Sequence, residues 1–160
     1  MKNIYKILED LGIKYAKHDH PPLFTCEQAE EYYAKIPGAH TKNLFLRNKK
    51  GDRYYLVVVE SKKRADINKL RADLGESKLA FGSPERLMNV LGLTPGSVTP
   101  FGLINDEQKQ VVKVLIDKDL FNFEVVNFHP LVNTTTLGIE VEDFKKFLDW
   151  TRHLWEETVI

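Results

Sequence analysis

The sequence predicts an α/β (α+β mixed) fold, a single domain with a mixed, mainly antiparallel sheet flanked by helices. Segments with helical spacing of apolar residues are interspersed with strand-like segments, as in domains whose helices and strands pack into shared layers. A chain of 160 residues has the usual size of one domain and is long enough to bury a core. The sequence contains no internal repeat, low-complexity tract or domain linker.

The helices are predicted from apolar residues spaced three and four apart and from residue types that begin or end helices. Near the N-terminus this spacing ends at Gly12, a residue type that commonly closes a helix. Thr25 and Gln28 have the spacing of a capping box, and Ser83 followed by Pro84 is typical of a helix start. The predicted helices span residues 4–11, 25–33, 66–75 and 84–92, and a last one begins at about residue 141.

The strands are predicted from alternating or continuous apolar residues bounded by turn residues. In "KNLFLRNKKGDRYYLVVVES" two apolar runs flank a polar segment with a glycine, which predicts a β-hairpin over residues 42–61. The other predicted strands lie within residues 13–20, 111–117, 123–129 and 134–140.

Composition excludes several classes of protein. Lys plus Arg and Asp plus Glu both total 23, so a general polyanion binder is not indicated, and any nucleic-acid contact requires a local patch. No segment approaches ~20 uninterrupted apolar residues, which predicts a soluble, cytoplasmic protein without a membrane partner.

The single cysteine, Cys26, excludes an internal disulfide and a multi-cysteine zinc site. A nucleophilic role at a helix start is one interpretation of Cys26, and a small packed side chain is the more common one.

Three stretches stand out from an ordinary fold. "TPGSVTPFG", residues 94–102, has two prolines and two glycines, so its backbone could follow a fixed path and point amide groups at a ligand, or could simply connect two elements. Lys42 and Asn43 lie at the mouth of an apolar strand, where a solvated lysine is also common. His129 and Asn133 flank a proline, and either could be structural. Nucleotide-binding, zincin and hydrolase-elbow motifs are absent.

"HTKNLFLRNKKGDRYYLVVV", "LGLTPGSVTPFGLIND" and "FHPLVNTTTLGI" follow one another in this order. Together they resemble the YbaK/ProX aminoacyl-tRNA deacylase family, freestanding relatives of the bacterial prolyl-tRNA synthetase editing domain. The similarity extends from about Tyr5 to Trp150 and is closest to the ProX group, the alanyl-tRNA(Pro) deacylases. It implies one editing domain over residues 1–160.

The resemblance also implies the site residues. Lys42 corresponds to the lysine that grips the 3′ end of the charged tRNA, and residues 96–100 correspond to a G-x-x-x-P loop that binds the aminoacyl group and positions the attacking water. The expected catalytic residues are Lys42, Gly96, Ser97 and His129, and the expected substrate-binding residues are Asn43, Val98, Thr99, Pro100 and Asn133. No metal or cofactor is expected. The expected partners are the acceptor end of a mischarged tRNA and prolyl-tRNA synthetase.

The implied reaction agrees with general physical limits. A synthetase built for proline cannot exclude the smaller alanine, because one or two methylenes contribute only ~1 to 3 kcal/mol of discrimination, so a second site must remove the wrong product. An aminoacyl ester is already activated, so a fixed water and a hydrogen-bonded carbonyl can suffice without a nucleophilic triad. Alanine is the first expectation. Cysteinyl, seryl or threonyl esters and a non-catalytic tRNA-end or small-molecule sensor are the alternatives.

Overall fold

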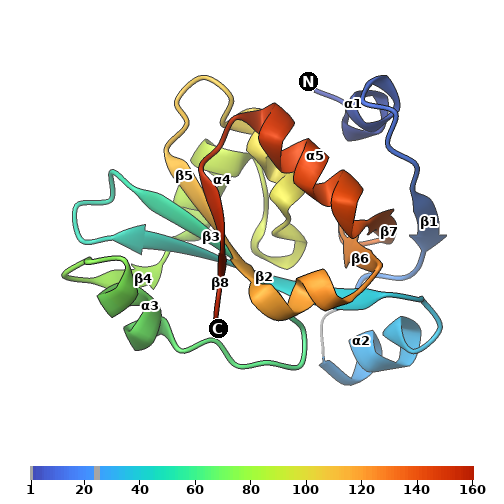
Figure 1. Cartoon of the computed structure of the whole chain (residues 1–160), viewed down its shortest axis with the longest axis horizontal. Coiled ribbons are helices and arrows are strands. Elements are labelled where there is room, and N and C mark those ends of the chain that lie inside the picture. Colours follow the sequence, from blue (N-terminus) through green and yellow to red (C-terminus); the bar gives the residue numbers. More distant parts are fainter. Residues whose placement is uncertain (1, 24–25) are drawn as a thin grey trace.

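The computed structural model of the chain describes residues 2–23 and 26–160. Within these residues the strands form one eight-stranded sheet, with helices packed around it (Figure 1). The strands are β1 (Ala16–Asp19), β2 (Ala39–Asn48), β3 (Tyr54–Glu60), β4 (Leu79–Phe81), β5 (Val112–Asp117), β6 (Val125–Phe128), β7 (Thr135–Glu140) and β8 (Trp155–Thr158). The α-helices are α1 (Ile4–Asp10), α2 (Cys26–Tyr33), α3 (Ile67–Asp73), α4 (Pro84–Leu91) and α5 (Val141–Thr151), and the 3-10 helices are η1 (Pro95–Ser97), η2 (Pro100–Asn105) and η3 (Lys118–Asn122).

The sheet is mixed, as predicted. Its strand order is β1-β7-β6-β2-β3-β5-β8, and β4 pairs with the far end of β2. Neighbours are antiparallel in the pairs β1–β7, β6–β7, β2–β3 and β2–β4, and parallel in the pairs β2–β6, β3–β5 and β5–β8. The α/β architecture predicted from the interspersed helices and strands is therefore confirmed.

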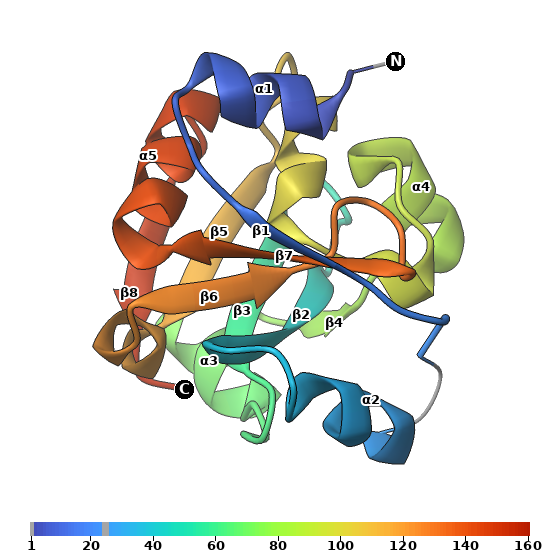
Figure 2. The ribbon, with the colours of Figure 1, turned by 90° about the vertical axis from the view of Figure 1, so that its right-hand side faces the viewer.

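Strand β2 joins the two parts of this sheet. Its first residues, Ala39 and His40, pair in parallel with β6, whereas residues 41–47 pair antiparallel with β3. Figure 2 shows β6 and β7 running across the direction of β3 and β5. The side chains that follow His40 on β2 therefore lie where two sets of strands diverge.

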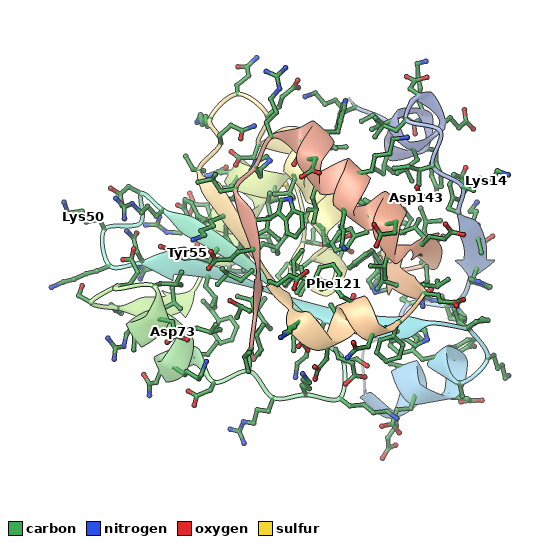
Figure 3. All side chains as sticks on the ribbon, viewed as in Figure 1. Lys14, Lys50, Tyr55, Asp73, Phe121 and Asp143 are labelled. Atoms are coloured by element: carbon green, nitrogen blue, oxygen red, sulfur yellow. The ribbon has the colours of Figure 1, made fainter. Side chains whose placement is uncertain are left out.

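Apolar side chains cover both faces of the sheet. The larger cluster includes Phe45 of β2 and the aromatic rings of α5 and η2; Phe101 and Phe147 pack edge to face with ring centroids 5.2 Å apart. A smaller cluster on the opposite face includes Leu46 and is covered by α3 through Leu70. Charged side chains such as Lys14, Lys50 and Asp143 project outward (Figure 3).

Local sequence explains most of the helix boundaries. The Ser83 hydroxyl accepts a hydrogen bond from the Arg86 amide at the start of α4, and Gly92 closes this helix with φ of 67°. Asp66 caps α3 in the same way through the amide of Lys69. The capping box predicted at Thr25 lies outside the described residues.

Several elements differ from the prediction. Strand β2 begins at Ala39 and not at Lys42, because its first residues gain a partner in β6. Strands β4 and β8 and the three 3-10 helices were not expected, since short segments carry no clear apolar period. The stretch over residues 94–102 does follow a fixed, non-repetitive path through η1 and into η2. Among the described residues, no helix is long and apolar enough to cross a membrane.

Candidate active site

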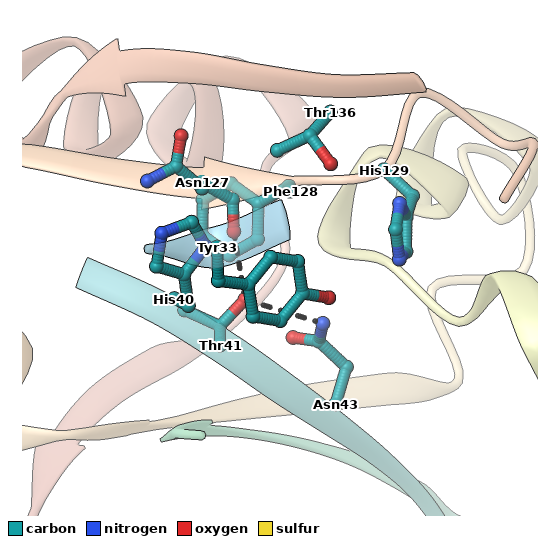
Figure 4. Close-up of a pocket in the computed structure, with 8 residues that line it drawn as sticks. All are labelled: Tyr33, His40, Thr41, Asn43, Asn127, Phe128, His129 and Thr136. Atoms are coloured by element: carbon teal, nitrogen blue, oxygen red, sulfur yellow. Dashed lines mark hydrogen bonds between the residues drawn. The ribbon is translucent and has the colours of Figure 1, made fainter. Parts of the chain in front are cut away.

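A small cavity lies where β2 leaves β6, and polar side chains surround it (Figure 4). Its volume is about 10 Å³, which is about the space that one water molecule requires. The lining residues come from the end of α2, the first half of β2, β6 with the residue that follows it, and β7: Tyr33, His40, Thr41, Asn43, Asn127, Phe128, His129 and Thr136.

Asn43 connects the cavity to the G-x-x-x-P loop. Its Nδ2 donates to the carbonyl oxygen of Val98 at 3.2 Å, and since a carbonyl can only accept, this bond fixes the orientation of the amide. The Oδ1 atom of Asn43 is buried and has no hydrogen-bond partner in the described part of the chain. An unpaired buried acceptor costs ~1 to 3 kcal/mol, so this oxygen is available to a water or a substrate group that donates.

His129 is held in one tautomer. Its Nδ1 donates to the carbonyl oxygen of Thr135 at 3.0 Å, which leaves Nε2 as a free acceptor in the neutral ring. Burial lowers the pKa of His129 below its ordinary value, and the nearby His20 ring, 6.0 Å away, lowers it further, although the bond to Thr135 opposes the shift. The ring is therefore neutral at pH 7.

Hydrogen bonds between residues close in sequence hold the loop that carries Gly96. The Ser97 amide donates to the Thr94 carbonyl at 2.9 Å, and the Thr99 hydroxyl accepts from the Phe101 amide at 3.3 Å. Ser97, Thr99 and Pro100 are buried, and neither Thr99 nor Pro100 lines the cavity. These two residues therefore fix the path of the loop, while the Val98 carbonyl reaches the site.

Gly96 is exposed and its backbone is not in the left-handed region. A Cβ atom at this position would have Asn133 Nδ2 as its neighbour, at an ordinary contact distance of 3.6 Å. Gly96 and the predicted Asn133 therefore lie side by side. The fold has room for a side chain here, so folding alone does not require this glycine.

Of the nine predicted site residues only Asn43 and His129 line the cavity, and Lys42 lies apart from both. It is the fourth residue of β2, opposite Val59, and not at the strand mouth as predicted. Because side chains alternate along a strand, the Lys42 side chain points to one face of the sheet and those of Thr41 and Asn43 point to the other. Lys42 does not line the cavity. Among the described residues its ammonium group makes no hydrogen bond or ion pair, so it is free to meet an anion.

Sequence reasoning missed part of the cavity wall. The ring of Tyr33 stacks on that of His40, with centroids 4.1 Å apart, and His40 Nε2 donates to the carbonyl of Ile36 at 2.9 Å. Burial raises the pKa of Tyr33 and lowers that of His40, so both side chains are neutral at pH 7. His40 and Thr41 belong to the "HTKN" segment and could have been found there, whereas no sequence signal marked Tyr33.

Asn127 fixes the turn that leads into β2. Its Nδ2 donates to the carbonyls of Pro37 and Ala39, at 2.9 and 3.1 Å. Thr41 donates its hydroxyl to the Asn127 carbonyl at 2.8 Å, beyond the last ladder pair between β2 and β6. Gly138 on β7 lies opposite Asn127, and a Cβ there would come within 2.9 Å of Asn127 Oδ1. The cavity floor therefore depends on this amide and on the small residue beside it.

The described residues contain no group of three or more His, Cys, Asp or Glu side chains that could bind a metal ion. Cys26 is the first residue of α2, but its side chain lies outside the described part of the structure, so its packing role stays a prediction. The polar side-chain groups that line the cavity are amides, imidazole rings and hydroxyl groups.

Comparison with known proteins places this geometry in a family. Residues 20–147 match the model of the aminoacyl-tRNA editing domain. A prolyl-tRNA editing protein ProX from Acetoanaerobium sticklandii is 38% identical over 141 residues, which cover 88% of this chain and 85% of the relative. A prolyl-tRNA synthetase associated domain-containing protein 1 from Bos taurus is 34% identical over 150 residues, or 91% of this chain and 86% of the relative.

A solved structure shares the fold. The crystal structure of a candidate trans-editing enzyme for prolyl tRNA synthetase superposes with a TM-score of 0.70 at 22% identity, covering 96% of this chain and 92% of that one. The family model and the ProX relative both span most of the sequence that builds the cavity. This chain belongs to the aminoacyl-tRNA editing domain family.

Proposed function

We propose that this protein hydrolyses the ester bond of mischarged alanyl-tRNA(Pro) in trans. The observation that carries the proposal is the small polar cavity that Asn43 and His129 line, with Asn43 bonded to the Val98 carbonyl of the G-x-x-x-P loop. The cavity belongs to a chain that is 38% identical to a prolyl-tRNA editing protein. Residues 1–160 act as one editing domain, and no metal or cofactor takes part.

In this mechanism, the groups at the cavity position a water molecule against an already activated ester. The free Nε2 of neutral His129 accepts a hydrogen bond from the water, which turns an oxygen lone pair toward the ester carbonyl. The unpaired Oδ1 of Asn43 accepts from a second donor, either the water or the substrate amine. The Gly96 amide approaches the carbonyl oxygen, where negative charge develops, while the Ser97 amide, bonded to the Thr94 carbonyl, holds the loop in place.

Selectivity arises from the cavity walls. The stacked rings of Tyr33 and His40 form one wall, and Phe128 contributes to the floor. A methyl side chain needs little space, whereas a proline ring must displace one of these aromatic groups, which is costly in a packed interior. The small cavity therefore acts as the second sieve after a synthetase that admits alanine.

The remaining site residues act on the RNA end and on the loop. Lys42, whose side chain leaves the other face of β2, meets a phosphate or sugar of the tRNA 3′ end outside the cavity. Asn133 lines the aminoacyl subsite beside Gly96, and Thr99 and Pro100 fix the loop that carries Val98. The acceptor end of tRNA is the partner, and prolyl-tRNA synthetase supplies the mischarged product. The protein therefore works in the cytoplasm, where tRNAs are charged.

A panel of charged tRNAs tests the proposed function. Purified protein is expected to release alanine from alanyl-tRNA(Pro) fastest, cysteine and serine from the corresponding tRNA(Pro) more slowly, and to leave prolyl-tRNA(Pro) intact. Release of the labelled amino acid is measured over time. Binding of tRNA without any turnover would instead identify a non-catalytic sensor of the tRNA end.

Replacing Gly96 tests whether the loop approaches the substrate closely. Because the fold has room for a Cβ here, Gly96→Val is expected to keep the melting temperature of the unchanged protein and to lose deacylation. Gly75→Ala is the matched control, since Gly75 has φ of 69° with no atom within 4 Å of its Cβ position. The control is expected to lose about 1 kcal/mol of stability and to remain active. An active Gly96→Val protein would remove the loop from the mechanism.

Replacing Lys42 tests the contact with the tRNA end. Lys42→Ala removes a charge-assisted contact of ~1.5 to 3 kcal/mol, which lowers the single-turnover rate constant roughly ten- to hundredfold. Truncating a partly exposed lysine leaves stability within ~0.5 kcal/mol. Lys118→Ala, an exposed lysine on η3, serves as the control. Equal rates for the two variants and the unchanged protein would leave Lys42 without a role.

The neutral form of His129 predicts a pH dependence. Since burial lowers its folded-state pKa below 6.5, the ring is neutral above that pH and gains a proton only as pH falls through the lowered value. Protonation blocks the Nε2 acceptor, so the single-turnover rate constant is expected to fall in this acidic range. In His129→Asn the rate is lower throughout and this acidic decline disappears. If the rate constant of the variant fell at acidic pH with the same profile as that of the unchanged protein, the decline would come from another titrating group.

A further inference from the structure

Positive side chains gather at the end of β2 that lies farthest from the cavity. Lys49 and Lys50 lie in the hairpin between β2 and β3, and Lys78 immediately precedes β4. All three are exposed. The last pair of the β2–β4 ladder joins Asn48 and Leu79. Lys49 and Lys78 follow this pair in register, one on each of the two neighbouring segments. We call these three lysines the basic hairpin patch.

The fold neutralises this patch only in part, because the Asp52 carboxylate attracts the Lys50 ammonium group within the hairpin. In the described structure none of the three lysines forms an ion pair, although lysines elsewhere do, such as Lys63 with Asp117 at 2.8 Å. The adjacent carboxylates bond to other groups: Asp52 accepts from Asn48 Nδ2 at 2.9 Å, while Glu76 accepts from the Tyr55 hydroxyl at 2.8 Å and pairs with Arg53 at 3.6 Å. Like charges that lie close together repel one another, and an anion that binds between them relieves this repulsion.

An aromatic side chain accompanies the lysines. Phe81, the last residue of β4, is 62% exposed and lies opposite Leu46 in the same ladder. Basic side chains beside an exposed aromatic ring are typical of surfaces that bind nucleic acid, where the ring stacks on a base or packs on a sugar. Net charge conceals this feature, because acidic residues elsewhere balance the total.

The patch and the cavity lie on one strand. Asn43 and Lys49 are six residues apart on β2 and its hairpin, which is ~20 Å at about 3.3 Å per residue. Figure 1 shows the hairpin at one end of the molecule and α2, which covers the cavity, at the other. A span of ~20 Å equals roughly six stacked nucleotides. Phe81 shares the sheet face of Leu46, whereas Asn43 points to the other face, so an RNA that reaches both places passes over the edge of the sheet at β4.

Resting on the proposed function, we propose that the basic hairpin patch binds the phosphate backbone of the acceptor arm of the tRNA whose aminoacyl end occupies the cavity. Lysine ammonium groups suit this task because they contact phosphates without reading sequence. The patch thus adds affinity for tRNA as a class, while the cavity selects the amino acid.

A binding experiment that needs no catalysis tests the patch. The triple variant Lys49→Gln, Lys50→Gln, Lys78→Gln is compared with Lys14→Gln, Lys109→Gln, Lys118→Gln, which removes the same charge at exposed lysines elsewhere. Lys14 and Lys50 lie at opposite ends of the molecule (Figure 3). The affinity of each protein for an uncharged RNA hairpin with the tRNA acceptor stem is measured by fluorescence anisotropy at several salt concentrations.

The patch variant is expected to bind the RNA hairpin at least tenfold more weakly and to show a salt slope reduced by about 0.7 to 0.9 for each lost contact. The control triple variant is expected to match the unchanged protein. Equal affinities and slopes for all three proteins, or no RNA binding by the unchanged protein, would overturn the proposal.

A second arm separates this proposal from the proposed function. The patch variant is expected to hydrolyse alanyl-adenosine, which lacks the acceptor stem, at the unchanged rate, while its kcat/KM for alanyl-tRNA(Pro) falls by the same factor as its affinity. Equal losses on both substrates would overturn the assignment of the patch to RNA binding. If the unchanged protein hydrolyses neither substrate, the proposed function fails, and the anisotropy result still decides whether the patch binds RNA.

Discussion

The hydrogen bonds from the Asn127 amide to the carbonyls of Pro37 and Ala39 determine where the cavity forms. They attach the turn after α2 to β6 and so fix the point at which β2 starts. Every residue that β2 contributes to the site then follows by strand alternation, and Tyr33 is brought over the cavity because α2 ends only a few residues before this turn. A buried amide that donates to two carbonyls is costly to replace, which makes Asn127 a structural requirement of the active site.

The same geometry separates the groups that act from the groups that support them. Asn43 and His129 each use one polar atom to bond a backbone carbonyl, and this bond fixes the orientation of the other polar atom. Orientation achieved in this way requires no reorganisation when the substrate binds, which is the condition under which weak polar groups contribute to catalysis. Thr99 and Pro100 work one step further away, because they shape the loop that offers the Val98 carbonyl to Asn43.

The sequence predicted the parts of the fold that depend on local chemistry. The start of a helix at Asp66 and the Ser83 cap were readable because these signals act within their own helices, and the hairpin was readable from the apolar runs on both sides of a polar turn. The site residues were predicted from three separated motifs. In the structure Asn43 and His129 line one cavity, and Asn43 bonds the Val98 carbonyl. Tyr33, Asn127 and Thr136 were missed, since their contribution depends on pairing between distant strands. The position of Lys42 was misjudged for the same reason: the parallel pairing of Ala39 and His40 with β6 lengthens β2 toward its N-terminal end.

The balanced number of acidic and basic residues did not predict the basic hairpin patch either, for a physical reason. A sequence with 23 acidic and 23 basic residues reports only the sum of its charges, whereas an anion responds to the charges within about one Debye length, ~8 Å at physiological ionic strength. Carboxylates such as Asp73, Asp117 and Glu107 form ion pairs with nearby lysines and cancel their fields locally. Lys42 has no such partner in the described structure, and neither do the three lysines of the basic hairpin patch. Strand β2 and its hairpin therefore carry lysines that form no ion pair in the described structure, although the chain as a whole is neutral.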